Sequence, residues 1–407
     1  MLKTGTVAIG QSTGQLIRLL CALWLAGIGV RLSLLAIPPV VPLIHNDLHI
    51  SETQVGLLIG LPLAVFALAS VLGSLLIARI GSTLAVILGM AIAALSGAAR
   101  GAAGNVGALY ATVIVLGFGI AVAQPALPTL VREWVPRRVA LGTVAYSSGM
   151  LIGATVASGL TIPFVLPLVG GSWRLALGLW GLFAILLVPG FFLLSPREQD
   201  HDPAESVIGR RWWPDFASPV VWLLGLTFGG NNAAYYATNA FLGDYLASQG
   251  NAPWLGTAFA WLNGAQIVAL GLLLLAADRL EGRAWPFAIF GPLLLAAFLG
   301  LIFVPTPPVI LVAAALVGFT SAVTMTATLA LPPFLSAPGD VAPTAAGMFT
   351  ISYACAIIFP IVSGALWDWT GLAWMSFMPS CICAVMLTVF GVAAARRRPA
   401  HRPSPRR

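Results

Sequence analysis

The sequence predicts an all-α polytopic membrane protein, with twelve transmembrane helices in two pseudo-symmetric six-helix bundles. Of the 407 residues, 59% are hydrophobic and only 8% are charged, whereas soluble domains carry about 25% charged residues. Apolar runs of roughly 20 residues, the length that spans a bilayer, recur along the whole chain. These observations exclude a soluble globular protein and make the lipid bilayer the first expected partner.

Glycines, prolines and charged residues break the apolar runs into twelve expected helices. They lie at 17–44, 54–78, 82–99, 106–130, 139–165, 173–194, 218–243, 253–277, 285–304, 308–334, 344–367 and 372–394. We therefore expect an N-terminal bundle (1–195), a cytoplasmic central loop (196–217), a C-terminal bundle (218–395) and a basic cytoplasmic tail (396–407).

The basic residues predict the orientation. With both termini inside, 17 of the 20 Lys and Arg residues lie on the cytoplasmic side, as the positive-inside rule requires. Arg100 and Arg174 fall outside, and Arg31 falls within a helix. The net charge of +7 thus reflects topology, and we expect no nucleic-acid partner. The expected location is the bacterial inner membrane, with multiple spans and both termini cytoplasmic.

The two halves repeat weakly at an offset of about 200 to 205 residues. A short basic loop follows the second helix of each half, "ARIGS" at 78–82 and "ADRLEGR" at 277–283. "QPALPTL" (124–130) and "LALPPFL" (329–335) end the fourth helices, and "GTVAYSS" (142–148) and "GMFTISY" (347–353) lie in the fifth. Parallel six-helix repeats with a ligand site at their interface are typical of secondary transporters.

These features resemble the major facilitator superfamily. Its signature loop, G-x-L-a-D-R-x-G-R-K, is kept here only at Arg79 and Gly81, with Ala78 in the acidic position, while the second copy has Asp278 and Arg279. Within that superfamily the chain is similar to the cyanate and 2-nitroimidazole transporter family. The similarity rests on an arginine followed by prolines (Arg31, Pro39, Pro42), on Leu61-Pro62, and on "GFGIAVAQPALPTLVREWVPRRVALGTVAYSSGMLIG" at 117–153. It implies rocking alternating access and a small anionic or planar polar substrate.

Arg31 is the first candidate for binding. It lies 13 residues after Arg18, so it is roughly 20 Å from either interface at about 1.5 Å per residue. A central arginine is usually paired or faces a cavity, yet no acidic residue is expected at its depth. Either the missing anion is the substrate, held by the planar fork of the guanidinium, or helix carbonyls or Asp244 neutralise Arg31 and its role is structural.

The repeat offset places the counterpart of Arg31 near residue 234, where Asn232, Tyr235, Tyr236 and Asn239 form one polar stripe at helical spacing. This stripe is either the other wall of the binding site or a set of helix-to-helix hydrogen bonds. Further polar residues at comparable depth are weaker candidates for substrate binding: Gln124, Tyr146, Asn263, Gln266 and Tyr353. Gly149 and Gly153 predict a close helix-to-helix contact.

Several residues are candidates for gating. Pro38, Pro39 and Pro42 disturb the end of the first helix, which then forms a mobile outer segment or a fixed kink. Glu133 lies among arginines at the inner face. Together these residues form either an ion-pair cluster that gates transport or a set of charges that only determines the membrane topology. Arg79, Asp278 and Arg279 of the basic loops complete the gating set.

The chain lacks a nucleotide-binding loop, a nucleophile elbow and a metal-ligand set. We therefore expect no cofactor, no metal and no enzymatic activity. The expected partners are a small-molecule or small-anion substrate and, as one alternative, a coupled proton, with the chain as a monomer. The competing interpretations are a multidrug or metabolite efflux carrier of the same superfamily, and a membrane receptor or scaffold that transports nothing.

Overall fold

A computed structural model describes residues 13–49, 52–196, 212–276 and 282–397, and within these residues the regular structure is helical. The first half contains α1 (Thr13–Leu35), η1 (Pro38–Val40), α2 (Val41–Leu48), α3 (Glu52–Ile80), α4 (Ser82–Ala99), η2 (Arg100–Ala102), α5 (Val106–Trp134), α6 (Val139–Leu160), η3 (Thr161–Val165), α7 (Leu166–Leu168) and α8 (Trp173–Leu194). The second contains α10 (Pro219–Ser248), η4 (Ala252–Trp254), α11 (Leu255–Ala276), α12 (Trp285–Phe303), α13 (Pro307–Leu329), α14 (Leu331–Leu335), η6 (Pro338–Asp340), α15 (Val341–Thr370), η7 (Ala373–Phe377) and α16 (Met378–Ala395).

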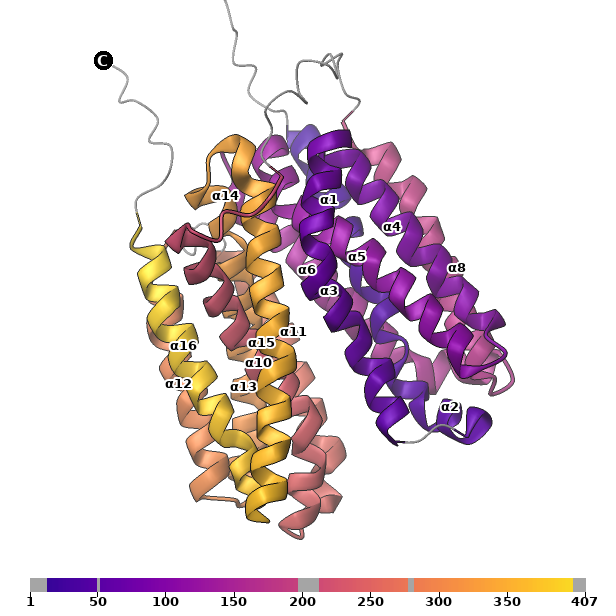
Figure 1. Cartoon of the computed structure of the whole chain (residues 1–407), viewed down its shortest axis with the longest axis vertical. Helices are drawn as coiled ribbons and strands as arrows, with labels where there is room; N and C mark the ends of the chain where they lie inside the picture. Colours follow the sequence, from indigo (N-terminus) through magenta and orange to yellow (C-terminus); the bar gives the residue numbers. More distant parts are fainter. Residues whose placement is uncertain (1–12, 50–51, 197–211, 277–281, 398–407) are drawn as a thin grey trace, which may run out of the picture.

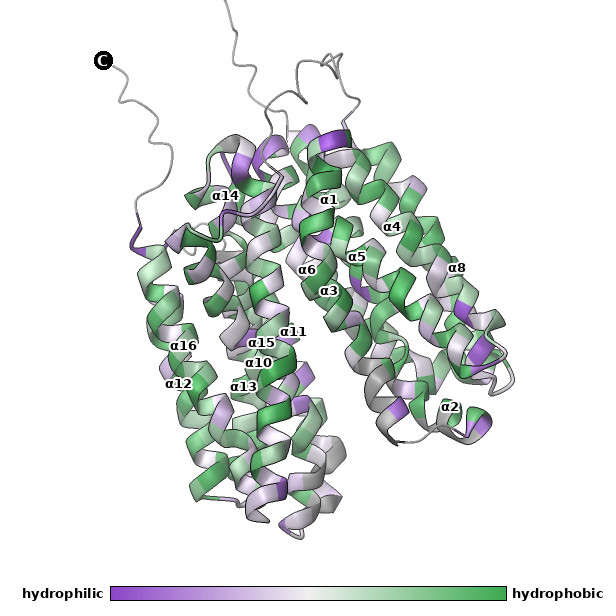
Figure 2. Cartoon of the chain, in the orientation of Figure 1, coloured by the Kyte–Doolittle hydropathy of each residue, from purple (hydrophilic) through white to green (hydrophobic). Residues whose placement is uncertain are grey.

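Among the described residues, ten helices are long and apolar enough to cross a membrane. Two further long helices are described. α11 contains an apolar stretch at Thr257–Leu273, and α10 is 30 residues long. The polar stripe lowers the hydropathy of α10. Figure 2 shows apolar residues along the helices and hydrophilic ones gathered toward both ends. The all-α, twelve-helix fold predicted from the sequence is confirmed.

The two halves pack their helices in the same order. In the first half α1 packs on α6 and α8, α5 on α3 and α4, and α4 on α8. In the second half the corresponding pairs are α10 with α15 and α16, α13 with α11 and α12, and α12 with α16. Between the halves, α3 contacts α15 and α6 contacts α11. This pattern matches the internal repeat expected from the sequence.

The halves approach each other most closely at one end of the molecule. Figure 1 shows the ribbons converging near α14, at the end where α1 begins and α16 ends, and diverging toward α2. We call these the inner and outer ends, after the predicted orientation. Cross-half hydrogen bonds near the inner end join α5 to the α14 segment and α6 to α13. The structure is therefore a conformation closed at its inner end.

The first helix ends earlier than the sequence pattern suggests. The apolar run predicts one helix over 17–44, but α1 ends at Leu35 and a short 3-10 helix and α2 follow. Pro38 and Pro39 have no backbone N–H for the preceding turn, and the residue before a proline disfavours the helical conformation. The prolines therefore end the membrane-spanning helix and do not merely bend it.

Glycines fix α1 closely against α6. A Cβ at Gly149 would overlap the carbonyl oxygen of Trp24, and one at Gly153 would lie 2.8 Å from the carbonyl oxygen of Ile28. Gly27 on α1 meets the backbone of Tyr146 in the same way. The close contact predicted from Gly149 and Gly153 is confirmed, and it places Arg31, four residues beyond Gly27, on a closely packed helix.

Candidate functional site

Arg31 lies in the last third of α1, between the two halves of the molecule. Its side chain is buried, with 9% of its surface exposed, and Nη1 donates a hydrogen bond to the hydroxyl of Tyr236 on α10 at 3.5 Å. Tyr353 and Tyr235 are also close enough to interact electrostatically with the guanidinium. Among the described side chains no carboxylate pairs with Arg31. The predicted alternative partner, Asp244, has a side chain outside the described set.

Arg31 and Tyr236 lie at closely related positions in the two halves. They are 205 residues apart, and Tyr236 is two residues beyond position 234, near which the repeat offset places the counterpart of Arg31. Each half thus contributes one side chain to this contact between α1 and α10. A charged donor from the first half and a phenol from the second form the centre of the candidate site.

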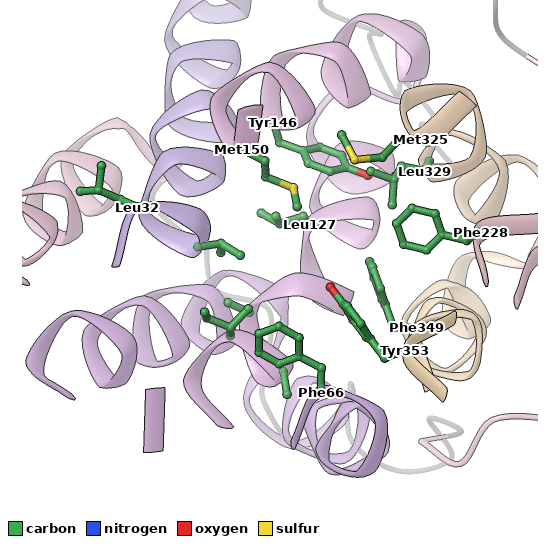
Figure 3. Packing of buried hydrophobic residues seen from close by; sticks show 14 of the residues in the cluster. Leu32, Phe66, Leu127, Tyr146, Met150, Phe228, Met325, Leu329, Phe349 and Tyr353 are labelled. Atoms are coloured by element: carbon green, nitrogen blue, oxygen red, sulfur yellow. Dashed lines mark hydrogen bonds between the residues drawn. The ribbon is translucent and has the colours of Figure 1, made fainter. Parts of the chain in front are cut away.

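Tyr353 connects this centre to the packing between the halves. Its hydroxyl donates a hydrogen bond to Oε1 of Gln124 on α5 at 3.1 Å. The centroid of its ring lies 4.9 Å from that of Phe66 on α3 and 6.1 Å from that of Phe349, on which the ring stacks. Figure 3 shows these three side chains together. Arg31, Gln124 and Tyr353 therefore form one cluster that spans both halves.

Three other candidates form a second cluster within the C-terminal half. Nε2 of Gln266 donates to the hydroxyl of Tyr235 and to Oδ1 of Asn263, at 3.2 Å each. Nδ2 of Asn263 donates to the carbonyl oxygen of Phe259. Tyr235 and Asn263 are half-buried, so the cluster satisfies its own donors and still presents polar surface beside Tyr236.

The remaining binding candidates lie elsewhere. Asn232 faces α15, where its Nδ2 donates to Oγ of Ser352 at 2.9 Å. Nδ2 of Asn239 donates to a carbonyl of its own helix. Tyr146 is nearer the inner end, and its hydroxyl contacts the carbonyl oxygen of Leu329 at 3.4 Å, beside Met325 (Figure 3). The structure thus does not gather the predicted binding residues into one contact set.

The proline-rich outer segment is held against its own half. Nη1 of Arg174, at the start of α8, pairs with Oδ2 of Asp47 on α2 at 2.5 Å, and Nε1 of Trp173 donates to the same oxygen at 3.3 Å. The hydrogen bond from Arg174, together with that from Trp173 and the charges of Arg174 and His49, lowers the pKa of Asp47. Sequence reasoning treated Asp47 and Arg174 only as outer-end charges.

At the inner end Arg132 links the halves. Its Nη1 donates to the carbonyl oxygen of Ser336 at 2.8 Å and also contacts that of Pro333. Glu133 accepts a hydrogen bond from the hydroxyl of Ser82. A cavity of about 140 Å³ adjoins Ser336 in the C-terminal half, away from Arg31. The sequence did not predict that Arg132 would contact the opposite half.

The loop residues proposed for gating are only partly described. Arg79 is exposed on the last turn of α3. Asp278 and Arg279 lie outside the described residues.

The burial of Arg100 was not predicted from the sequence. Expected as an outer charge, it is fully buried after α4, where Nη2 donates to the carbonyl oxygen of Ser33 at 2.6 Å and Nε to that of Gly97 at 3.3 Å. Both carbonyls belong to the last turns of their helices, where a nearby cation stabilises the helix. Arg100 therefore anchors the end of α1 at Ser33, which is two residues beyond Arg31. The run of small residues around it, "GAARGAAG" at 97–104, is the signal that could have indicated burial.

Comparisons with known proteins agree with this architecture. Residues 20–250 match the family model of the Major Facilitator Superfamily. The chain is 26% identical over 366 residues to the uncharacterized transporter YycB of Bacillus subtilis, covering 89% of each chain. It is 26% identical to the 2-nitroimidazole transporter of Escherichia coli, covering 90% of this chain and 92% of that protein. The cyanate transport protein CynX of Escherichia coli is 24% identical, with 91% and 95% covered.

A solved structure supports the fold. The transporter FucP in its outward conformation superimposes with a TM-score of 0.70 at 15% identity, covering 92% of this chain and 97% of that chain. The family model spans more than half of the present sequence, and the helix order and the duplicated halves agree with it. The chain is thus a multi-pass membrane transporter and belongs to the Major Facilitator Superfamily.

Proposed function

We propose that the protein is a secondary active or facilitative transporter for a small anion or planar polar molecule, either cyanate-like or nitroimidazole-like, with Arg31 as the central substrate-binding charge. One observation carries this proposal. The guanidinium is buried between the two halves, and the described groups that interact with it are phenols, with no carboxylate paired to it. A buried cation without a counter-charge is costly, and a bound anion would remove that cost.

The neighbours of Arg31 fit such a ligand. A guanidinium offers several donors in one plane, which suits a carboxylate-like or other delocalised anion. Tyr235, Tyr236 and Tyr353 are close enough to interact electrostatically with it, and aromatic faces favour a flat solute. The names of two relatives, a cyanate transport protein and a 2-nitroimidazole transporter, are consistent with this class.

The transport step is proposed to be a rocking of the two halves about the site. In the described conformation the inner end is closed by contacts of Arg132 and Tyr146 with the opposite half. These contacts must break when the inner end opens. Pro38 and Pro39 separate α1 from α2 and Pro42 lies in the first turn of α2; these prolines are proposed to let the outer segment move when its contacts with α8 break, while Glu133, Arg79, Asp278 and Arg279 are proposed to act at the inner face.

The coupling mechanism follows from the same site. Proton-coupled carriers usually keep a carboxylate within the membrane, and none of the described carboxylates pairs with Arg31. We therefore infer uniport, or symport of a weak acid in which the substrate brings the proton. Inward or outward flux would occur across the bacterial inner membrane, with both termini cytoplasmic as the distribution of basic residues predicts.

Transport in proteoliposomes tests the proposal. Uptake of labelled cyanate and of 2-nitroimidazole is measured for the wild type, Arg31→Gln and Arg31→Lys. We expect uptake of at least one solute to be lost in Arg31→Gln and partly retained in Arg31→Lys, because lysine keeps the charge but not the planar fork. Unchanged uptake by Arg31→Gln would disprove the role of Arg31, and export of varied apolar drugs independent of residue 31 would indicate an efflux carrier.

A further inference from the structure

Gln124 has a donor that no described residue uses. The side chain lies on α5 and is 2% exposed. Its Oε1 accepts the hydrogen bond from Tyr353 at 3.1 Å, but its Nε2 is buried without a partner in the described part of the chain. Buried amide donors are rarely left unpaired, because the lost hydrogen bonds to water are not replaced. The free donor of Gln124 therefore requires an explanation.

The orientation of this amide follows from the protons of its neighbours. The oxygen and nitrogen of a glutamine amide are similar in shape, so the hydrogen-bond network must distinguish them. The hydroxyl of Tyr353 donates to Oε1 of Gln124 in the structure, and the guanidinium of Arg31 is close enough to Tyr353 to interact with it electrostatically. A nearby cation favours a phenol whose oxygen faces the cation and whose proton points to Gln124, so the amide oxygen is the acceptor. The amide nitrogen is left facing away from Tyr353 with its protons unused.

The second amide cluster of the site behaves differently. Nε2 of Gln266 donates to both Tyr235 and Asn263, and Nδ2 of Asn263 donates to a backbone carbonyl. These amides have partners in the described structure and need no ligand. The unpaired amide donor thus lies on the N-terminal half, in the described cluster that contains Arg31.

We propose that the ligand held by Arg31 also accepts a hydrogen bond from Nε2 of Gln124, so that the substrate is an anion with at least two acceptor atoms. This inference rests on the proposed function of Arg31. Cyanate, carboxylates and nitro-substituted anions have such atoms, whereas simple ammonium ions do not. Gln124 is then a specificity-determining residue, and Tyr353 is a positioning residue that orients the amide of Gln124 by donating to its Oε1.

Equilibrium binding to the purified full-length protein tests this inference. The probes are potassium cyanate, nitrate, acetate and 2-nitroimidazole, and the variants are Gln124→Met and Gln124→Glu. Methionine has a similar volume and no donor, and we expect affinity to fall about 10- to 100-fold, as for loss of one hydrogen bond to a charged group. Glutamate keeps an acceptor for Tyr353 but places a negative charge at the donor position, so the loss should be larger.

The pH dependence separates this role from a structural one. Nitrate stays anionic over the accessible pH range, so its own protonation does not change. In Gln124→Glu the affinity for nitrate should recover on acidification, because a protonated carboxyl group again offers a donor. The wild type and Gln124→Met lack that group and should show no such recovery. Relief of charge repulsion alone would restore no more than the affinity of Gln124→Met, so recovery above that level indicates a donor at position 124.

Two control variants make every outcome informative. Thr324→Val removes a buried hydrogen bond to Asn231 on α10 and should change affinity less than about threefold. If the wild type binds none of the anions, or if Arg31→Gln binds them normally, the proposed function itself fails. If Arg31→Gln loses binding but both Gln124 variants keep affinity within about threefold, only the inference about Gln124 is overturned. The inference about Gln124 is supported if Arg31→Gln and both Gln124 variants lose affinity for the anions and Gln124→Glu recovers affinity at acid pH.

Discussion

The two halves of the transporter share one helix arrangement but divide the polar chemistry at their interface. At closely related positions on α1 and α10, the first half has Arg31 and the second has Tyr236. The amides follow the same division, because Gln124 in the first half keeps an unused donor while Gln266 in the second donates twice to its own neighbours.

This difference indicates how a duplicated fold becomes an asymmetric site. The repeat fixes where the two central side chains meet, but it does not require them to be alike. Among the described site residues, the first half has the uncompensated guanidinium of Arg31 and the buried, unpaired Nε2 of Gln124, so that half is suited to bind an anion. The second half contributes aromatic rings and a self-satisfied polar network. Four changes in the sequence sharpen this comparison, beginning with the one expected to be most disruptive.

Gly149→Ala tests how closely the first half is packed. The new Cβ would overlap the backbone of Trp24 on α1, and because backbone cannot yield as a side chain does, the helices must separate. We expect destabilisation of about 1–3 kcal/mol or more, measured by thermal unfolding in detergent. Gly271→Ala on α11, with nothing within 4 Å of the added Cβ, is the matched control and should be neutral or stabilising. Equal effects would contradict the packing argument.

Arg100→Gln tests the anchor at the end of α1. The shorter side chain cannot maintain the hydrogen bonds to the carbonyls of Ser33 and Gly97. We expect a loss of about 1–3 kcal/mol in unfolding free energy and weaker ligand binding, because the helix end that carries Arg31 is less constrained. Arg137→Gln, at an exposed inner-end position, controls for loss of a positive charge. An effect no greater than that of the control would disprove the anchor.

Tyr236→Phe tests the asymmetry directly. The change removes the phenol that accepts from Arg31 at 3.5 Å but keeps the ring. Since this hydrogen bond is long, and the guanidinium retains Tyr353 and the ligand, we expect affinity for the anion to fall less than about fivefold. Arg31→Gln should reduce it by more than about 100-fold. Comparable losses in the two variants would mean that both halves bind the substrate equally.

Asp47→Asn is expected to have the smallest effect. Arg174 lowers the pKa of Asp47 in the folded protein, so the ionised carboxylate stabilises the fold above the usual pKa of Asp, about 3.9. That contribution is lost as the pH falls through the lowered pKa. The variant should therefore melt slightly below the wild type at neutral pH, and the difference should disappear in acid. A difference that persists at low pH would rule out the ion pair as its cause.

Much of the fold could be predicted from the sequence because it depends on length and hydropathy. Apolar runs mark the membrane-spanning helices, and the repeat offset predicted that Arg31 would face the middle of α10. The end of α1 could not be predicted from apolar periodicity, which continues to residue 44. It depends on the missing N–H groups of Pro38 and Pro39, whose effect was expected to be either a mobile outer segment or a fixed kink.

The candidate site was less predictable because contacts between helices depend on their relative rotation and depth. Periodicity grouped Asn232 with Tyr235 and Tyr236, yet Asn232 faces Ser352 on a neighbouring helix. Tyr353 and Gln124 were single polar residues in separate helices, and only the structure brings them together. Arg100 was interpreted by its position after a helix, although burial depends on what packs around it.

The most direct test is a thermal-shift screen of small anions and nitro-heterocycles against the wild type and Arg31→Gln. If Arg31 binds the substrate, at least one of these compounds will stabilise the wild type in a concentration-dependent manner, as preferential binding to the folded state requires. The same compound will leave the melting temperature of Arg31→Gln unchanged. Equal stabilisation of both proteins would contradict the account, because the ligand would then bind without the charge at the centre of the proposed site.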